Sequence, residues 1–252
     1  RDSNLGQNFS KPFKIKFIGE DEKDHYVWQT SWGISTRLIG ALVMVHGDDK
    51  GLVLPPKKAP CQVVIVPIFY KETKKDLMLN KAREIFKKLE ENGIATILDD
   101  REEYTPGWKF NQWELKGVPI RIEIGPRDIE RRQVIAARRD TFERIAVKEE
   151  ELMDTVNKML KEIQENLFNQ AKKFLKEHIT SVENYPELKK VLRKRGGFIR
   201  ACWCSNQTCE EKIKEETGAT IRLIPFEKEE LFSNCVYCGD KAKEVVYFAR
   251  AY

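Results

Sequence analysis

Cysteines carry the clearest chemistry in the last part of this sequence. Five of the six cysteines lie between residues 202 and 238, and two pairs among them have short spacings, Cys204-x4-Cys209 and Cys235-x2-Cys238. A glycine follows the second pair and lets the backbone turn there. Zn²⁺ takes four thiolates in a tetrahedron, and two such pairs supply that geometry. The spacing predicts a closed, structural zinc site whose binding contributes on the order of 10 kcal/mol to folding.

Two other interpretations of these cysteines are disulfides and unpaired buried thiols. The sequence shows no secretory feature, and reducing compartments disfavour disulfides, so zinc is favoured. Cys202 competes with Cys204 for the fourth ligand position. We expect the two side chains to leave a strand on opposite faces, so we assign Cys204 to the metal and Cys202 to the core. No His, and no Glu placed to activate a water molecule, accompanies the cluster, so we expect no reaction there.

A second stretch that could do chemistry is SWGISTRLIG, residues 31–40. It is typical of a strand end followed by small residues and then a helix whose first turn carries Arg37. A guanidinium in that position, facing a sheet, suits phosphate oxygens because its planar fork donates parallel hydrogen bonds. An arginine at a helix start is nevertheless more often a solvated surface charge. The pattern alone leaves both interpretations open.

The elements that position these residues follow from the alternation of strand-like and helix-like segments. The middle of the chain predicts an α/β layer with a mixed sheet, with strands at 62–68, 94–100, 118–126, 132–141 and 143–148 and helices at 74–93 and 105–117. Ahead of it we expect strands at 13–19 and 25–33, a helix at 35–48, and a short strand with a Pro/Lys linker at 51–60. Behind it we expect a long amphipathic helix at 149–178 and a shorter helix at 182–197.

Two of the predicted helices have apolar faces that should pack on a core. In the helix at 74–93 that face consists of Leu77, Ala82, Ile85, Phe86 and Leu89. In the helix at 149–178 it consists of Leu152, Val156, Leu160, Ile163, Leu167, Ala171 and Phe174. Both faces follow the helical period, so both helices should be surface helices covering a core on one side.

Length and composition bound the class of protein. The 252 residues suffice for two domains or three small ones, and 41% hydrophobic residues support ordinary cores. The net charge of +5 suits a nucleic-acid partner, although many proteins without one look the same. No run approaches the roughly 18 apolar residues of a membrane helix. The start has neither a signal sequence nor an initiator Met, so we expect a C-terminal part of a longer, cytoplasmic protein.

Several stretches together resemble a known family. Residues 31–38 have the order of small, apolar and glycine residues before an arginine that looks like the third signature motif of class II aminoacyl-tRNA synthetases. The segments LGQNFSK, HGDDKGLVLPP, DDREEYTPGWKFNQWELKGVPIRIEIGPRD and the terminal ARAY narrow the resemblance to prolyl-tRNA synthetases of the eukaryote/archaeon type. The resemblance covers essentially the whole chain, and residues 99–128 are its most specific part.

The resemblance implies three parts with a fold class of α/β and α+β. Residues 1–58 resemble the end of a class II catalytic domain with an antiparallel sheet. Residues 59–148 resemble an α/β anticodon-binding domain with a mixed sheet. Residues 149–252 resemble a small α+β zinc-binding C-terminal domain. The four cysteines singled out above fall on the metal-ligand positions of that domain, in agreement with their spacing.

The resemblance also implies roles for residues of the first part. Arg37 matches the catalytic arginine that holds the γ-phosphate of ATP, and Thr36 lies beside it at the nucleotide. Trp32 and Gly33 match positions that line the proline pocket. One departure is Ser3, which stands where the family usually has His. The other two class II motifs are absent, so we expect this chain alone not to catalyse.

A third stretch, WELKGVPIRIEIGPR, supplies residue types that can read guanine. Proline anticodons carry guanine at their second and third positions, and these loop bases are unstacked, so their edges are open. Arginine suits the N7 and O6 acceptors of guanine and a carboxylate suits its N1–H and N2–H donors. The resemblance places the anticodon contacts at Glu114, Arg121 and Arg127. Without the resemblance, Glu114 and Arg121 would be interpreted as an ordinary surface ion pair.

Other residues near this stretch have less specific assignments. Lys109 and Lys116 are plausible phosphate partners. Trp108, Phe110 and Trp113 could stack on bases, but aromatics at that spacing on a short helix are more often core, and Trp113 especially so.

The resemblance therefore implies a C-terminal portion of a proline–tRNA ligase, an enzyme that activates proline with ATP and Mg²⁺ and transfers it to tRNA(Pro). We expect the full-length enzyme to be a homodimer without a membrane segment. Two alternatives are a non-catalytic tRNA-binding accessory protein and another class IIa synthetase, such as the threonyl or histidyl type. Adenylate formation separates the first alternative, and anticodon swaps separate the second.

Overall fold

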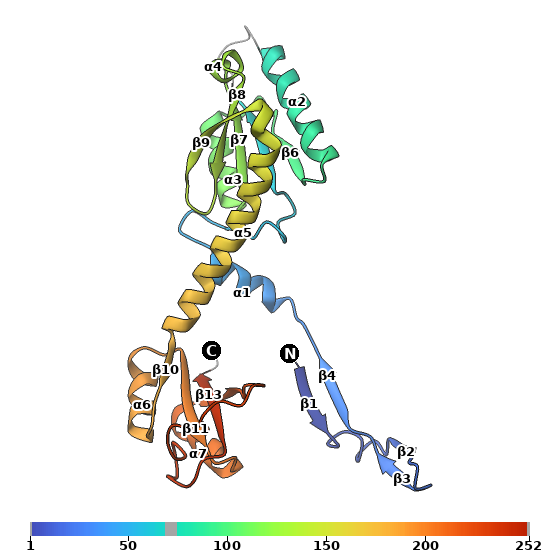
Figure 1. Cartoon of the computed structure of the whole chain (residues 1–252), viewed down its shortest axis with the longest axis vertical. Helices are drawn as coiled ribbons and strands as arrows, with labels where there is room; N and C mark the ends of the chain where they lie inside the picture. The colour runs from blue at the N-terminus through green and yellow to red at the C-terminus, as the bar shows by residue number, and fades with distance from the viewer. Residues whose placement is uncertain (1, 69–74, 251–252) are drawn as a thin grey trace. The chain divides into compact units, whose positions relative to one another are not determined.

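The computed structural model describes residues 2–68 and 75–250, with side chains described from residue 5 onward. The chain divides into two compact units, residues 1–164 and 165–252 (Figure 1). The domain boundaries predicted after residues 58 and 148 stay predictions, because these units are defined by compactness alone.

The first 46 residues form two small antiparallel ladders and one helix. β1 (Asp2–Gly6) pairs with β4 (Gln29–Trp32), and β2 (Lys16–Ile18) pairs with β3 (Asp24–Tyr26). α1 (Arg37–His46) ends at Gly47, as predicted, and none of the residues in this fully described helix is buried. Many large apolar side chains here are exposed, among them those of Phe13, Phe17, Ile18, Trp28, Trp32, Ile34, Leu38, Ile39, Met44 and Val45.

Two strand predictions in this part need correction. The strand expected at 25–33 is two strands, because the chain leaves its ladder with β2 before it joins its ladder with β1. The strand expected within 51–60 does not form, and only Gly51 of that segment makes a bridge, with Asp48. Prolines at 55, 56 and 60 have no backbone N–H to give to a ladder, which disfavours a strand there.

The rest of the first unit is built on a five-stranded mixed sheet in the order β6-β5-β7-β8-β9. The strands are β5 (Val63–Pro67), β6 (Thr96–Leu98), β7 (Ile120–Ile124), β8 (Gln133–Arg138) and β9 (Arg144–Lys148). β5 pairs in parallel with β6 and β7, whereas β7, β8 and β9 are antiparallel. Every residue of β5 is buried, as expected for a central parallel strand of Val and Ile. The predicted mixed sheet is confirmed.

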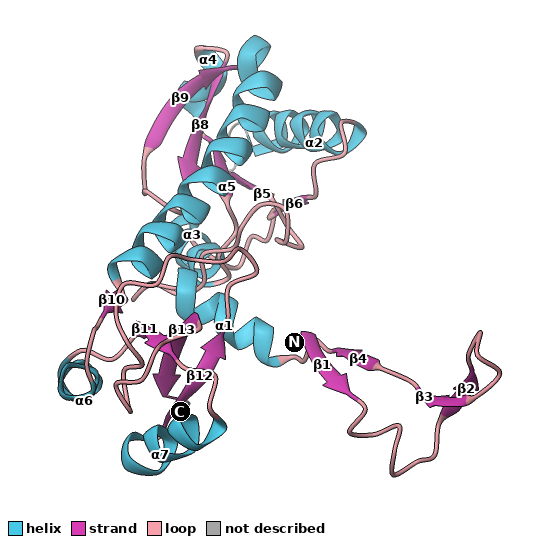
Figure 2. Cartoon of the chain, turned by 60° about the horizontal axis from the view of Figure 1, so that its bottom comes forward, coloured by secondary structure: helices cyan, strands magenta, loops and turns pink. Residues whose placement is uncertain are grey.

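Helices flank this sheet (Figure 2). They are α2 (Lys75–Glu91), α3 (Pro106–Leu115) and the short α4 (Pro126–Glu130). α3 starts with Thr105 as its N-cap, whose side chain accepts a hydrogen bond from the backbone N–H of Trp108, and with a proline at its first position.

The buried face of α2 differs in part from the prediction. The buried residues of this helix are Met78, Leu79, Ala82, Ile85 and Leu89, whereas Leu77 is exposed. Phe86 is half-buried. Met78 lies four residues before Ala82, so it, and not Leu77, continues the stripe at helical spacing.

α5 (Leu152–Glu177) is the long helix that the sequence predicts, and a 3₁₀ turn at Glu149–Glu151 precedes it. The predicted apolar residues from Leu152 to Leu167 are buried. Ala171 is half-buried and Phe174 is exposed, with its ring stacked 3.9 Å from that of His178. The amphipathic prediction therefore holds for the first two thirds of the helix.

The second unit contains a four-stranded sheet in the order β10-β11-β13-β12. The strands are β10 (Ile179–Ser181), β11 (Phe198–Trp203), β12 (Ala219–Leu223) and β13 (Glu244–Arg250), and the helices are α6 (Tyr185–Lys194) and α7 (Gln207–Thr217). One core joins residues of both helices to the two central strands: Leu188, Leu192, Ile213, Ile199, Ala201, Val246 and Phe248. α6 and α7 therefore pack on the same face of the sheet. No helix in the described part of the chain is long and apolar enough to cross a bilayer.

Candidate functional site

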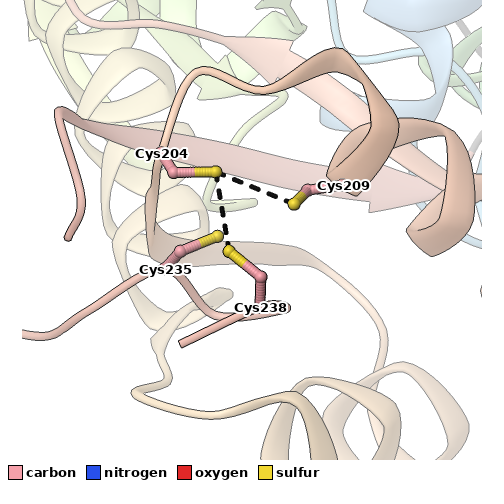
Figure 3. Close-up of side chains that lie close together, drawn as sticks. All are labelled: Cys204, Cys209, Cys235 and Cys238. Atoms are coloured by element: carbon pink, nitrogen blue, oxygen red, sulfur yellow. Dashed lines mark hydrogen bonds between the residues drawn. The ribbon is translucent and has the colours of Figure 1, made fainter. Parts of the chain in front are cut away.

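Four cysteines of the second unit converge on one point, as predicted. The Sγ atoms of Cys204, Cys209, Cys235 and Cys238 all lie within 4.8 Å of one another (Figure 3). The Sγ of Cys204 is 3.7 Å from that of Cys209 and 3.7 Å from that of Cys238. No other group of His, Cys, Asp or Glu side chains in the described residues has this metal-binding arrangement.

These distances fit a tetrahedral metal. With metal–sulfur bonds of about 2.3 Å, the edge of a Zn–S₄ tetrahedron is about 3.8 Å, close to the two sulfur separations above. Four soft thiolates favour zinc or an iron centre over magnesium or calcium, which prefer oxygen ligands. The residues present therefore fit a structural metal ion that all four thiolates surround.

Three local structures bring the sulfurs together. Cys204 follows the end of β11, and Cys209 lies in the first turn of α7, whose N-cap Asn206 accepts a hydrogen bond from the backbone N–H of Thr208. Cys235 and Cys238 lie on one tight turn that closes when the N–H of Gly239 donates to the carbonyl oxygen of Cys235 (3.0 Å). Gly239 has a φ of 77°, which glycine adopts without steric cost.

Cys202 is buried away from this cluster, so the assignment of Cys204 agrees with the structure, but the reason given for it is wrong. Residues two apart in a strand point to the same face. The two side chains separate because β11 ends at Trp203 and Cys204 already belongs to the following loop. Cys202 packs with Ala242 and Val245 instead.

The pKa values of the thiols indicate how a metal would bind. Burial raises the pKa of the Cys209 thiol to about 11, and burial also raises the pKa of Cys238. Burial acts on Cys235 in the same direction, but backbone N–H groups of the turn outweigh it and lower the pKa of that thiol. A metal must therefore displace protons from Cys209 and Cys238, so metal affinity should fall as the pH is lowered.

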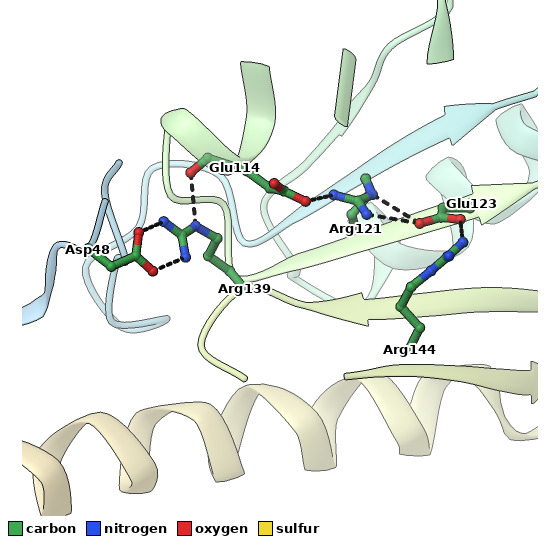
Figure 4. Close-up of polar contacts among 6 residues, drawn as sticks. All are labelled: Asp48, Glu114, Arg121, Glu123, Arg139 and Arg144. Atoms are coloured by element: carbon green, nitrogen blue, oxygen red, sulfur yellow. Dashed lines mark hydrogen bonds and ion pairs between the residues drawn. The ribbon is translucent and has the colours of Figure 1, made fainter. Parts of the chain in front are cut away.

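A charged cluster forms the second candidate site, on the sheet of the first unit (Figure 4). Nη1 of Arg121 on β7 donates to Oε1 of Glu114 near the end of α3 (2.9 Å). Its Nε and Nη2 donate to Oε1 of Glu123 (3.1 and 3.0 Å). The other oxygen of Glu123 accepts from Arg144 on β9. Arg121 and Glu123 are two apart on one strand, so both side chains face the same side of the sheet.

Glu114 and Arg121 lie side by side, and their side chains are 23% and 11% exposed, respectively. The Arg121 guanidinium also lies over the ring of Phe110, 4.1 Å from its centroid. A carboxylate and a guanidinium are thus held next to each other and are partly open to solvent.

Arg127 lies apart from this pair. Arg121 is near the start of β7, whereas Arg127 follows the end of that strand in the first turn of α4 and is exposed. α3 and α4 are found at opposite ends of the sheet (Figure 1). The structure brings together two of the three predicted anticodon residues, and Arg127 belongs to a separate surface.

Lys109 is not a phosphate partner, contrary to the prediction. Its side chain is 2% exposed, and its ammonium group donates to the carbonyl oxygen of Asp99 (3.1 Å). Trp113 is core, as predicted, and its indole N–H donates to Oδ2 of Asp99 (2.7 Å). Trp108 is exposed and stacks on Tyr104 at 3.8 Å between ring centroids, contrary to the preference for core, while Lys116 is exposed.

The predicted nucleotide and proline residues lie around the start of α1. Trp32 ends β4, Thr36 is the N-cap of α1 and Arg37 is its first residue. All three are exposed, and so is Gly33. They lie close together along the chain, within the stretch that joins β4 to α1.

Sequence reasoning missed several members of the charged cluster. Glu123 could have been found from the strand alternation that places it beside Arg121. Arg139 and Asp48 form an ion pair across 91 positions of the chain, and no local pattern signals it.

Comparison with known proteins decides the family. Residues 62–159 match the family model described as anticodon binding domain, and residues 185–252 match the one described as prolyl-tRNA synthetase, C-terminal. The chain is 51% identical over 252 residues to a proline–tRNA ligase of Natranaerobius thermophilus, covering 99% of this chain and 51% of the relative. The chain belongs to the prolyl-tRNA synthetase family.

Other prolyl-tRNA synthetases support this family assignment. A proline–tRNA ligase 2 of Clostridioides difficile is 48% identical over 248 residues, covering 98% of this chain and 51% of that protein. A crystal structure of prolyl-tRNA synthetase from Cryptosporidium parvum, complexed with L-proline and AMP, aligns with a TM-score of 0.90 at 41% identity. That alignment covers 100% of this chain and 54% of the other. The chain thus spans about half the length of the prolyl-tRNA synthetases that it matches.

Proposed function

We propose that this chain is part of a proline–tRNA ligase, which activates proline with ATP and then transfers it to tRNA(Pro). The proposal is supported by relatives that are named proline–tRNA ligase and are about 50% identical to this chain over nearly its whole length. The observation that carries the part played by this chain is the partly exposed Glu114–Arg121 pair within the residues that match an anticodon-binding domain. Residues 1–58 would complete the catalytic domain, 59–148 would bind the anticodon, and 149–252 would form the zinc domain.

The residues of this chain that take part in catalysis would lie around the start of α1. Arg37 would hold the γ-phosphate of ATP, with Thr36 beside it, and Mg²⁺ would neutralise the leaving phosphates. Trp32 and Gly33 would line the proline pocket. The exposure of this stretch is consistent with a site that is completed by residues outside the chain. The chemistry would depend on positioning and on neutralising phosphate charge.

The remaining assignments concern the metal, the RNA and the cell. Zn²⁺ would bind the four cysteines as a structural ion. Glu114 and Arg121 would read two neighbouring guanines of the anticodon, and Arg127 would make a separate contact with the tRNA. The full-length enzyme would act as a homodimer in the cytoplasm.

Amino-acid activation by the full-length protein tests the first step of this activity. Purified enzyme is mixed with ATP, Mg²⁺ and each of the twenty amino acids, and exchange of pyrophosphate into ATP is measured. Exchange with proline alone supports the proposal. Exchange with threonine or histidine would assign another class IIa synthetase, and no exchange with any amino acid would favour the accessory protein.

Arg121→Ala tests the anticodon assignment. We expect the variant to lose roughly 1–3 kcal/mol of binding to a tRNA with guanine at the second and third anticodon positions, because a bidentate base contact is removed. Binding to a tRNA with other bases there should change little. The measurement is a filter-binding titration of both tRNAs at one fixed salt concentration, since phosphate contacts depend on salt.

Arg83→Ala is the matched control, because Arg83 is an exposed arginine on α2 and its loss changes the net charge equally. It should reduce binding of both tRNAs slightly and equally. If Arg121→Ala behaved in the same way, Arg121 would contact phosphate only.

A further inference from the structure

Arg139 joins two parts of the first unit that the family assigns to different domains. Its side chain is 2% exposed. Nη1 and Nη2 donate to the two carboxylate oxygens of Asp48 (2.7 and 2.6 Å), and Nε donates to the main-chain carbonyl oxygen of Glu114 (2.9 Å) (Figure 4). One guanidinium therefore uses its whole fork to hold a residue from each part.

The Asp48 side of this contact is continuous with α1. Asp48 lies two residues past the end of that helix, separated from it only by Gly47. The hydrogen bonds from Arg139 hold the pKa of Asp48 at about 2, so the carboxylate is ionised at neutral pH. The helix that begins with Arg37 is thus followed, after Gly47, by a carboxylate that is bound to Arg139.

Backbone contacts reinforce the same junction. The N–H of Leu52 donates to the carbonyl oxygen of Leu115 (3.0 Å), and the N–H of Leu54 donates to that of Gly117 (3.2 Å). A Cβ on Gly117 would come within 2.6 Å of the carbonyl oxygen of Leu52, so the two backbones touch directly. The chain after α1 is therefore fixed on the turn that follows α3.

The Glu114 side of the contact is continuous with the charged cluster. Arg139, Glu114 and Arg121 line one cavity of about 10 Å³, which leaves room for about one water molecule. The main chain of Glu114 is held by Arg139 while its side chain is held by Arg121. Arg139 and Arg121 therefore hold the same residue, one through its main chain and the other through its side chain.

We infer that Arg139 is a positioning residue that couples anticodon recognition to the catalytic end of the enzyme through its paired contacts with Asp48 and Glu114. This inference rests on the proposed function, since it takes Glu114 as an anticodon reader and α1 as part of the ATP site. Binding of the correct guanines fixes Glu114, and Arg139 passes this constraint to Asp48 and so to the end of α1. The coupling is one between two separate sites of one enzyme.

Asp48→Asn in the full-length enzyme tests the coupling, because it weakens the contact without touching Glu114 or Arg121. The measured quantity is the anticodon penalty, the ratio of kcat/KM for native tRNA(Pro) to that for a tRNA with its second anticodon guanine replaced. We expect this penalty to shrink by about tenfold, within the usual range of coupling between sites. Pyrophosphate exchange without tRNA should change by less than about twofold, because no anticodon is then bound.

Asp49→Asn is the matched control, because the exposed neighbouring residue loses the same charge. It should leave the penalty as in the unchanged enzyme, and Asp48→Glu, which keeps a carboxylate, should restore part of it. A thermal melt of each variant establishes that it is folded. If Asp48→Asn has a clearly lower melting temperature than the unchanged enzyme, the experiment is done with Arg139→Lys instead, because a lysine cannot bind both Asp48 and Glu114.

Three results would overturn the inference. An anticodon penalty unchanged by Asp48→Asn would mean that no coupling runs through the contact. An equal loss of kcat/KM on both tRNAs would mean that Arg139 is only structural. An unchanged enzyme that shows no penalty at all, while it charges tRNA with proline, would remove the anticodon role of Glu114 and the coupling with it, but would leave the proposed ligase activity standing.

Discussion

Removal of the metal from the four-cysteine cluster is expected to unfold much of the second unit. Residues 224–243 contain no helix or strand, and Cys235 and Cys238 lie in this segment. The metal would tie it to Cys204, which directly follows β11, and to Cys209 in α7. Binding of a structural zinc is worth on the order of 10 kcal/mol, comparable with the whole stability of a domain. Hydrogen–deuterium exchange after chelation should therefore rise over residues 198–250 and stay low over β5 and β7.

Cys204→Ser and Cys202→Ser separate the ligand from its neighbour. Cys204→Ser should reduce the bound zinc, measured by elemental analysis, and reproduce the exchange pattern of the chelated protein. Cys202→Ser should keep one zinc per chain, because Cys202 packs in the core away from the cluster. Loss of zinc from Cys202→Ser alone would show that the fourth ligand has been misassigned.

Asp99→Asn is expected to lower the free energy of unfolding strongly. The Asp99 side chain is fully buried and accepts hydrogen bonds from both Arg101 and Trp113, and the buried ammonium of Lys109 lies 3.8 Å from its carboxylate. Losing the negative charge leaves Lys109 in the core without its counter-charge. Breaking a buried ion pair costs about 3–5 kcal/mol, and we expect about 3 because Arg101 remains partly solvated. Urea unfolding measures the loss, and a change of less than about 1 kcal/mol would contradict it.

Asp100→Asn is the matched control, because Asp100 is exposed and should cost little. The pH dependence gives a second test. Burial opposes ionisation of Asp99, but Arg101, Trp113 and Lys109 outweigh it and lower its pKa. A pKa below the unfolded value of about 3.9 means that this stabilisation is present above about pH 4 and is lost as the pH falls further. Asp99→Asn should therefore lose less stability than the unchanged protein on acidification below pH 4.

The sequence predicts the sheet of the first unit well because its strands and helices repeat local patterns. β5 is a continuous run of Val and Ile, and α2 has an apolar stripe that ends at a glycine. Helical spacing from Ala82 and Ile85 identifies Met78, and not Leu77, as part of the buried stripe of α2, so the sequence held the information that the prediction of Leu77 missed. The split between β3 and β4, in contrast, depends on which partner each strand finds.

The candidate sites also contain some residues that the sequence predicted and others that it did not. Short spacing along the chain predicted the cysteine cluster, and family resemblance assigned Glu114 and Arg121, which lie in contact, to one site. Lys109 was misjudged because lysines are rarely buried, and only the folded chain places Asp99 beneath it. The Arg139–Asp48 contact joins segments whose separation along the chain hides it from any periodic pattern.

The closeness of the cysteine sulfurs also has a redox consequence. Two thiols 3.7 Å apart need little movement to form a bond, and peroxide converts a thiolate to a sulfenic acid that condenses with such a neighbour. A coordinated metal would shield the sulfurs from this reaction, so we expect the protein to be sensitive to oxidants when the site holds no ion. A disulfide formed then would occupy two of the four ligands and block reloading until a reductant cleaves it.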